Sequence, residues 1–497
     1  MLHCASARTH PCAAVASTRS VAFASSCGLD AQAHAAGGVV PTAGALVTVY
    51  ACVPLNASDG GFTARVDPLV RMYSPNAFVG RLAPAAARQP PADIWEGVVA
   101  LAFDLKHEEL VESGKTSFMC TRGVVRGVPS GMYNYIVVHE FGGHAWDAPW
   151  DPDAPGGNFG TSLVSLEART PWLEPLPTTG EMLDVTHHSA PHALPDCGHG
   201  AMDGTWRTGL FVPFGCALRD VSGDGFERCM SRLNGTVMLM GDSNTRRAFK
   251  AVYGRSSWCP VADAAHEAWH CRCEDCGYEC LAPENATMPR FFDVFAHAGA
   301  YIGLGVTNAI DGDGAGGASS KFLYVTMSGY HPGAFGAFAA ERERAGGRRI
   351  AAVVVAGFGA WAEAQLNATT YMEQLAAMLG ELAAAVSRGD IASDVAIIFR
   401  PAPYTCCASM LAHRYGSKRG SMLTSLYRRA ALAAFPRALW WDTRALSEAR
   451  PLAEVRSLTQ ECRSNHLNTR LLHEDARVLM HLLCVAADAQ PTPTPHA

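Results

Sequence analysis

The pattern of apolar and polar residues divides the chain into two differently organised parts. Before about Trp150 the apolar runs are short and are separated by Gly, Pro or Asp, whereas beyond Leu233 continuous apolar runs alternate with amphipathic stretches. Continuous runs are typical of parallel strands covered on both faces, and short interrupted runs are typical of antiparallel structure. The sequence therefore predicts a small β-sandwich followed by an α/β domain with a doubly wound parallel sheet.

Five apolar runs in the second part are predicted to be its strands: Thr236–Met240, Phe322–Met327, Ile350–Ala356, Val395–Phe399 and Ala438–Trp441. Between the third and fourth runs, apolar residues at a 3-4-3-4 spacing from Met372 to Val386 predict one helix, which Gly389 ends. A last helix is expected after His466. Because a doubly wound sheet binds its ligand at the carboxyl ends of its strands, the residues that follow each run are the candidate site.

The first part has four predicted strands, at Leu46–Cys52, Trp95–Phe103, Thr116–Cys120 and Met132–Val138. Together with the local composition, these runs set the predicted organisation of the chain. It comprises a leader or disordered arm (1–44), a β-sandwich (45–150), a connector rich in Pro and Gly and held by disulfides (151–230), the α/β domain (231–487) and a disordered tail (488–497).

Charge and cysteine content limit the kinds of molecule that the protein is expected to bind and the cellular compartments in which it is expected to reside. A net charge of −6 without a long Lys/Arg block argues against nucleic acid, and no apolar run approaches the ~18 residues of a membrane span. Seventeen cysteines favour the secretory pathway, in the Golgi lumen or outside the cell. Glycosylation sequons favour it too, at Asn56, Asn234, Asn285 and Asn367. Residues 1–29 contain no Asp or Glu and no apolar core, which is closer to an organelle transit peptide, so that alternative stays open.

The first strand of the α/β part ends in the most informative string, Gly241-Asp242-Ser243-Asn244. A glycine turn at the end of a parallel strand exposes the serine hydroxyl, and the free N–H groups of the next helix stabilise an oxyanion. The alternative is an ordinary helix N-cap. A nucleophilic serine needs a base, for which His466, ahead of the predicted last helix, is the candidate.

Residues 231–484 resemble the PC-esterase branch of the SGNH/GDSL-type hydrolases, which includes trichome-birefringence-like glycan O-acetyltransferases and neurexophilin-type esterase domains. The matching positions are Gly241-Asp242-Ser243-x-x-Arg246, Gly215-Cys216 with Cys229, Val353–Trp361, and Ile397–Arg400 with Pro403. The resemblance implies a three-layer αβα fold after a filamin- or immunoglobulin-like sandwich. It also implies a serine-dependent O-acetylesterase or O-acetyltransferase that acts on a glycan or glycoconjugate, with neither a cofactor nor a metal.

The resemblance and the strand ends together give the predicted site. Ser243 is the nucleophile and His466 the base. The oxyanion donors are expected to be backbone N–H groups of Ser243, Gly329, Gly357 and Gly359. Substrate contacts are expected from Asp242, Asn244, Arg246, Arg247, Trp361 and Arg400. The alternative role for Asp242 is an i,i+4 ion pair with Arg246.

Two positions depart from the family pattern. Arg463 stands where relatives carry an Asp three residues before the histidine, so Glu461, Asp442 or a backbone carbonyl is expected to orient His466. Gly357 stands where the family often offers an Asn side chain to the oxyanion. Losing a triad acid costs up to about 10⁴-fold in rate, so a catalytically inactive carbohydrate- or protein-binding relative is the alternative function.

Two further groups of residues, one of histidines and one of cysteines, are candidate metal sites. His139 and His144 are five residues apart, which is not the i,i+4 pair of a zinc-protease helix, so a strand end and a turn are favoured over a metal-dependent hydrolase. Cys271, Cys273, Cys276 and Cys280 are crowded into ten residues, which favours disulfides over zinc.

Overall fold

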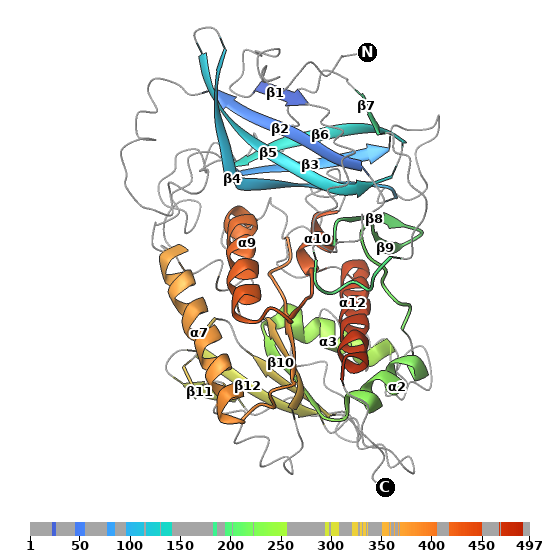
Figure 1. Cartoon of the computed structure of the whole chain (residues 1–497), viewed down its shortest axis with the longest axis vertical. Coiled ribbons are helices and arrows are strands. Elements are labelled where there is room, and N and C mark those ends of the chain that lie inside the picture. Colours follow the sequence, from blue (N-terminus) through green and yellow to red (C-terminus); the bar gives the residue numbers. More distant parts are fainter. Residues whose placement is uncertain are drawn as a thin grey trace.

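The computed structural model describes residues 22–25, 45–54, 77–84, 96–113, 116–129, 131–141, 182–185, 194–200, 202–221, 223–255, 294–297, 300–307, 321–326, 329–330, 332–333, 335, 350–356, 358, 362, 366, 368–404, 417–449, 467 and 469–490. They form a mixed α/β structure with an antiparallel sheet and a largely parallel sheet (Figure 1).

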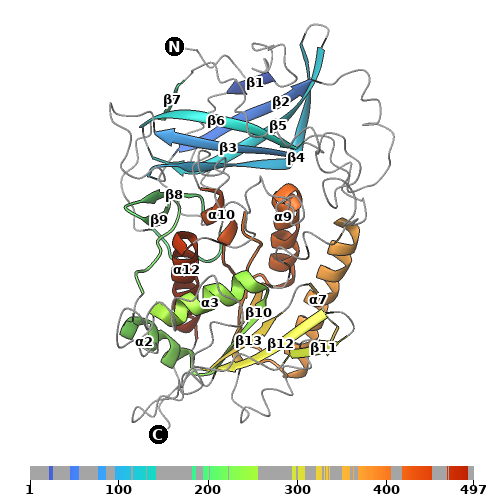
Figure 2. The same ribbon diagram turned by 180° about the vertical axis from the view of Figure 1, so that it is seen from behind.

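The largely parallel sheet has the strand order β11-β12-β13-β10-β14-β15-β16. Strand β10 pairs in parallel with β13 on one side and β14 on the other, and β14–β15 and β15–β16 are also parallel. The pairings β11–β12 and β12–β13 are antiparallel (Figure 2). The strands are β10 (Thr236–Gly241), β11 (Val294–His297), β12 (Ala300–Thr307), β13 (Lys321–Thr326), β14 (Ile350–Ala356), β15 (Ala396–Phe399) and β16 (Leu439–Trp440).

Among the strands whose side chains are described, β10 and β14 are buried on both faces, as their continuous apolar runs predict. In β10, Val237 and Leu239 enter the cluster formed with helices α2 (Gly223–Leu233), α3 (Ser243–Arg255) and α12 (Thr469–Asp488). Met238 and Met240 enter the opposite cluster, formed with α7 (Ala368–Arg388) and α9 (Ser417–Ala434). Because side chains alternate along a strand, one run of apolar residues serves two cores.

The antiparallel sheet follows the order β1-β2-β5-β4-β3-β6-β7, and the hairpin β8–β9 joins it through β4. Strand β4 is shared, because its first residues pair with β3 and the rest pair with β5. The strands are β1 (Ala22–Ser25), β2 (Ala45–Pro54), β3 (Ala77–Pro84), β4 (Val99–Ser113), β5 (Thr116–Val128), β6 (Gly131–Phe141), β7 (Met182–Val185), β8 (Gly204–Arg207) and β9 (Leu210–Pro213).

The sequence located the five strands that are joined by parallel pairings, but it missed β11 and β12. Their antiparallel pairings make the sheet mixed, where a wholly parallel sheet was predicted. Residues Ile350–Ala356 match β14, and α7 spans the predicted helix and ends before Gly389, which has φ +78°. In the antiparallel part, β4 begins four residues later than predicted, and β1, β3 and β7 were missed. Strand β1 lies within the segment that was predicted to be a leader or disordered arm. The β8–β9 hairpin lies inside the stretch that composition alone marks as a connector.

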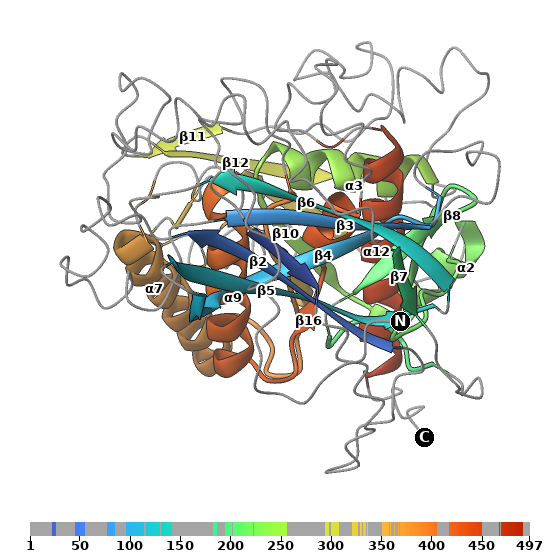
Figure 3. The same ribbon diagram turned by 90° about the horizontal axis from the view of Figure 1, so that it is seen from above.

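The antiparallel sheet lies over the end of the α/β part at which β15 and β16 finish (Figures 1 and 3). The Arg81 guanidinium of β3 lies 5.8 Å from the centre of the Tyr404 ring, five residues beyond β15. The Met202 N–H donates to the Asp442 carboxylate directly after β16, over 3.2 Å. The carboxyl ends of these strands therefore face the antiparallel sheet.

Asp203 is a half-buried acid between the two parts. Its carboxylate accepts the Arg126 N–H over 3.3 Å, while its own carbonyl accepts the Phe214 N–H over 2.8 Å. Burial, and to a smaller extent the negative charge of Asp442, raises the pKa of Asp203 to about 6. The contact between the two parts therefore contains an acid that titrates near neutral pH.

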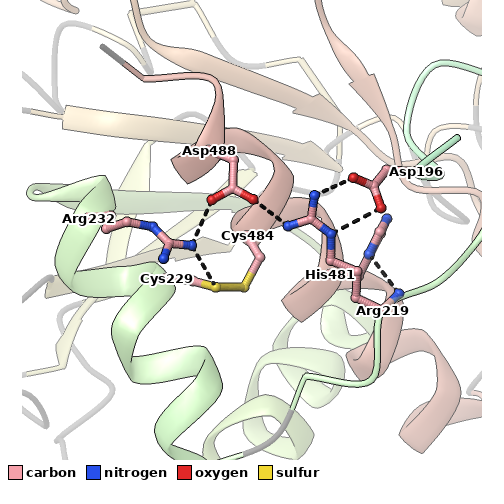
Figure 4. Close-up of a disulfide and its surroundings, with 7 residues drawn as sticks. All are labelled: Asp196, Arg219, Cys229, Arg232, His481, Cys484 and Asp488. Carbon is pink, nitrogen blue, oxygen red and sulfur yellow. Dashed lines mark hydrogen bonds and ion pairs between the residues drawn. A yellow bond between two sulfur atoms is a disulfide. The ribbon is translucent and has the colours of Figure 1, made fainter. Parts of the chain in front are cut away.

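Helix α12 is anchored near its carboxyl end by covalent and ionic contacts (Figure 4). A disulfide joins Cys484 to Cys229 in α2, and Arg219 bridges Asp196 and Asp488. His481 is buried, its Nδ1 accepts the Arg219 N–H over 3.1 Å, and its Nε2 therefore carries the proton toward the carbonyl of Cys197 at 2.9 Å. Burial lowers the pKa of His481, so the neutral ring is the form that fits this site.

A second disulfide, between Cys197 and Cys216, closes a short loop in the segment that precedes α2. Disulfides form and persist in oxidising compartments. The sequon residue Asn234 is exposed in the turn between α2 and β10. Within the described part of the chain, no helix combines the length and the apolar character needed to cross a membrane.

The two disulfides should differ in their effect on stability. Cys229 and Cys484 are 255 residues apart, against 19 for Cys197 and Cys216. By loop-closure entropy we expect the Cys229→Ser/Cys484→Ser variant to lose about 5 kcal/mol of unfolding free energy and the Cys197→Ser/Cys216→Ser variant about 3 kcal/mol. Denaturant unfolding of both variants checks this. A larger loss for the short loop would contradict the predicted order.

Replacing Asp203 by Asn should change how stability depends on pH. The native pKa of about 6 lies above the value of 3.8 for the free side chain, so its stabilising contribution is full below about pH 4 and is lost as pH rises through 6. The unfolding free energy of the wild type minus that of Asp203→Asn should therefore fall by about 2 kcal/mol between pH 4 and 7. Parallel stability profiles for the two proteins would refute the shift.

Candidate functional site

The turn after β10 places Ser243 as the first residue of α3. Asp242 is buried, and its Oδ1 accepts the N–H groups of Asn244 over 3.0 Å and Thr245 over 3.3 Å, so Asp242 is the residue that caps the helix. The capping role considered for Ser243 therefore belongs to its neighbour. Asp242 thus accepts the N–H groups of the second and third residues of α3. The N–H group of Ser243, the first residue, is not bonded to this cap.

Gly241 is required by the close approach of α3 to the end of β10. A Cβ atom at this position would lie 2.3 Å from the Thr245 Oγ1 and 2.9 Å from the Cβ of Ala356 in β14. Both distances are shorter than any van der Waals contact. The helix can start directly above the strand only because residue 241 has no side chain.

Asn244 joins the turn to the segment that precedes α12. Its side chain is 1% exposed, and its Oδ1 accepts the backbone N–H of Leu467 over 3.2 Å. This bond spans 223 residues of sequence. Sequence analysis predicted that Asn244 binds substrate, whereas the structure shows its carbonyl oxygen fixing the chain next to the predicted base.

Arg400 lies at the predicted edge of the sheet but not in an exposed position. The side chain is 2% exposed and donates to the Asp475 Oδ2 over 2.6 Å and to the Thr245 Oγ1 over 3.2 Å. Its guanidinium also lies 4.5 Å from the centre of the Trp441 ring. We therefore assign Arg400 to a network beneath the turn rather than to contact with substrate.

Asp442 follows β16, as predicted, and caps the short helix α10 (Thr443–Glu448). One carboxylate oxygen accepts the Ala445 N–H over 3.2 Å and the other accepts the Met202 N–H over 3.2 Å. Burial raises the pKa of Asp442. Both oxygens thus hold backbone groups, which favours a structural role over the orientation of a histidine.

Two segments considered for the oxyanion site are held by packing against α7 and α9. Tyr330, next to Gly329, donates its hydroxyl to the Glu381 carboxylate of α7 over 2.9 Å. Phe358, between Gly357 and Gly359 in sequence, is fully buried and packs edge-on against Tyr371 at 5.2 Å between ring centres. The described neighbours of these glycines are therefore firmly anchored.

Several predicted positions lie outside the described residues or have side chains that are not described. The first group comprises Gly357, Gly359, Trp361, Glu461, His466, His144 and the cysteines 271–280; the second comprises Ser243 and Arg246. Arg247 is described and is 3% exposed. His139 lies in β6, as the strand interpretation predicts. In the described part of the chain, no three His, Cys, Asp or Glu side chains gather as a metal site would require.

Sequence reasoning missed three polar residues of this region, Thr245, Thr443 and Asp475. Each is completely buried and makes a hydrogen bond to a residue at least 32 positions away in sequence. The available signal was their position, because Thr245 and Thr443 stand at the first turns of helices that follow strand ends. Asp475 in an otherwise apolar helix was the clearest hint of a buried partner.

Comparison with known proteins finds no matching family model, no matching curated protein and no matching solved structure. The site is therefore defined by its own geometry: a serine at the start of α3, above a parallel sheet, with the segment that ends at Leu467 bonded to the next residue of the helix.

Replacing Gly241 by Ala tests the close approach of helix and strand. Thr245 is held by Arg400, so it cannot move aside cheaply, and we expect the added methyl group to lower the unfolding free energy by about 1–3 kcal/mol. Gly380 in α7 is the matched control, because a Cβ there meets nothing within 4 Å. Gly380→Ala should instead add about 0.5–1 kcal/mol. Equal effects in denaturant unfolding would contradict the steric argument.

Proposed function

We propose that this protein is a serine-dependent O-acyl esterase or acyltransferase, with Ser243 as nucleophile and His466 as base. The observation that carries the proposal is the hydrogen bond between Asn244 and Leu467. The residue that follows the proposed nucleophile is bonded to the residue that follows the proposed base. Consecutive Cα atoms are only about 3.8 Å apart, so this bond ties together the two chain segments on which the chemistry depends.

The sheet topology supports the same position. In chain order, the five strands joined by parallel pairings lie in the order 2-1-3-4-5, with β10 first and β13 second. The chain leaves β10 toward β13 and returns to β14 on the other side, so the carboxyl end of β10 is a topological switch point. Ligands of doubly wound sheets bind at such points. This strand order is compatible with an SGNH-like αβα domain, and we propose that finer assignment together with a sandwich-type β-domain before it.

The proposed reaction proceeds through an acyl-enzyme. His466 removes the proton of Ser243 Oγ as that oxygen attacks the ester carbonyl, and N–H groups of Ser243 and Gly329 stabilise the resulting oxyanion. The alkoxide leaves with the proton from His466. Water, or a hydroxyl of an acceptor sugar, then attacks the acyl carbon as its proton passes to His466. The second tetrahedral intermediate collapses by breaking the ester bond to Ser243 Oγ, which takes that proton back from His466. The first acceptor makes an esterase and the second a transferase.

The acid that orients the histidine differs from the family pattern. Asp442 is occupied by two backbone N–H groups, so Glu461 or a backbone carbonyl is the favoured partner of His466. The alternative function is a catalytically inactive protein that binds carbohydrate or a protein partner. Arg463 in place of Asp, and Gly357 in place of Asn, favour that alternative.

The substrate class and compartment are part of the proposal. A glycan or glycoconjugate is suggested by the resemblance of residues 231–484 to PC-esterase domains. Two disulfides in the described chain are compatible with the secretory pathway or the extracellular space, where glycans are abundant.

Labelling of the full chain by a fluorescent alkyl phosphonate tests the nucleophile directly. We expect one labelled serine in the wild type and complete loss of labelling in Ser243→Ala. His466→Ala should slow labelling, and hydrolysis of p-nitrophenyl acetate, by at least about 10³-fold, because the hydroxyl then has no base. The labelling rate should also fall at acid pH, because a protonated imidazole cannot act as the base.

Exposed Ser425 in α9 provides the matched serine control, and Ser425→Ala should label at the wild-type rate. Absence of labelling in correctly folded wild type at every pH from 6 to 9 would reject the esterase. Binding of wild type to an acetylated glycan array without turnover would then support the inactive carbohydrate-binding alternative.

A further inference from the structure

A buried ion pair lies beneath the proposed site and connects its two halves. Arg400 extends from the end of β15, where its backbone N–H donates to the Val355 carbonyl over 3.0 Å and so continues the sheet. One terminal nitrogen donates to Thr245, two residues after Ser243, and the other donates to Asp475 of α12. The guanidinium therefore bridges the helix that begins with Ser243 and the helix that follows His466.

Asp475 has a second partner that fixes its orientation. Its Oδ1 accepts the Thr443 hydroxyl over 2.6 Å, while its Oδ2 binds Arg400. Asp475 and Thr443 are fully buried and Arg400 is 2% exposed. With both carboxylate oxygens bonded and the guanidinium stacked on Trp441, a small rotation of α12 would break several contacts at once.

The location of this pair determines what it controls. Helix α12 begins at Thr469, three residues after His466, and Asp475 lies two turns into the helix. The Asn244–Leu467 bond is a single neutral hydrogen bond, typically worth about 1 kcal/mol, and cannot fix the orientation of a whole helix. The buried ion pair instead fixes α12 to the end of β15, a strand of the rigid sheet.

We propose that Arg400 and Asp475 form a positioning pair that sets the separation between Ser243 and His466. The inference rests on the proposed esterase or acyltransferase function. Neither side chain touches the acyl group, and each acts through the helix that it holds. A displacement of about 1 Å between reacting groups is enough to cost about 10²-fold in rate, so a modest shift of α12 would be visible in the chemistry.

The residue that precedes Asp475 in α12 provides a matched control for burial and charge. Glu474 is 2% exposed, pairs with Arg477 over 2.7 Å, and accepts the Phe211 N–H of β9 over 3.1 Å. It is therefore a buried, ion-paired carboxylate on the same helix. Its contacts are to the β8–β9 hairpin and not to α3 or the end of β15.

The experiment compares Asp475→Asn with Glu474→Gln in the full chain. Both variants lose a buried charge, so both should unfold at a lower temperature than the wild type. Phosphonate labelling of Ser243, measured well below both unfolding midpoints, should slow about 10²-fold in Asp475→Asn and less than about twofold in Glu474→Gln. The apparent pKa of the labelling reaction should also shift in Asp475→Asn alone, because the contact between serine and imidazole changes.

If Asp475→Asn does not fold, Thr443→Val and Thr245→Val test the same proposal. Each removes one uncharged hydrogen-bond partner, Thr443 from Asp475 and Thr245 from Arg400. Both should slow labelling more than tenfold, and Thr245→Ser should restore the rate. Labelling in wild type with unchanged rates in the Asp475 or threonine variants would overturn the positioning pair and leave the esterase standing. Equal slowing in Glu474→Gln would also overturn it. Wild type that labels at no serine would reject the esterase and the positioning pair together.

Discussion

Helix α12 carries charged and polar side chains into the interior, and they bond to three different parts of the chain. Asp475 binds Arg400 at the end of β15, Glu474 and Arg477 hold β9, and His481 bonds to the segment that precedes α2. The remaining face is apolar and fills the core against α2 and α3. An apolar face alone lets a helix slide or rotate with little loss of contact, whereas these polar pairs match in one position only.

The buried ion pairs of α12 determine the position of the helix more than they stabilise the fold. A buried ion pair often contributes little net stability, because the loss of hydration offsets the attraction between the charges. Removing one partner, however, leaves a buried charge and costs about 3–5 kcal/mol. The pairs therefore select one position of α12 rather than adding much to the free energy of folding. The disulfide between Cys229 and Cys484 restrains the far end of the same helix.

The sequence analysis predicted features that depend on residues close together in the sequence, and it missed contacts between residues that are far apart. Strand β14 and helix α7 were predicted because their patterns are local and strong, and the Gly241–Ser243 turn was predicted because all its residues are adjacent in sequence. The structural contacts of Arg400 and Asp442 could not be predicted, because their partners, Asp475 and Met202, are 75 and 240 residues away. A single sequence shows that a charged residue follows a strand, but not whether a distant segment covers it. The β8–β9 hairpin was missed for a related reason, since the edge of β9 is completed by side chains of α12.

The turn itself shows how closely the backbone and the proposed chemistry depend on each other. Gly241 allows α3 to start against the sheet, and this brings Thr245 into reach of Arg400. Asp242 then takes the cap, so that the next residue is a serine at a helix N-terminus whose hydroxyl the cap does not need. A larger residue at position 241 would push α3 outward, and the Thr245–Arg400 contact and the Asn244–Leu467 bond would both lengthen. Glycine and aspartate in this order thus meet two separate demands, close approach of the helix and satisfaction of its first N–H groups. The serine that follows them begins α3 at the switch point of the sheet.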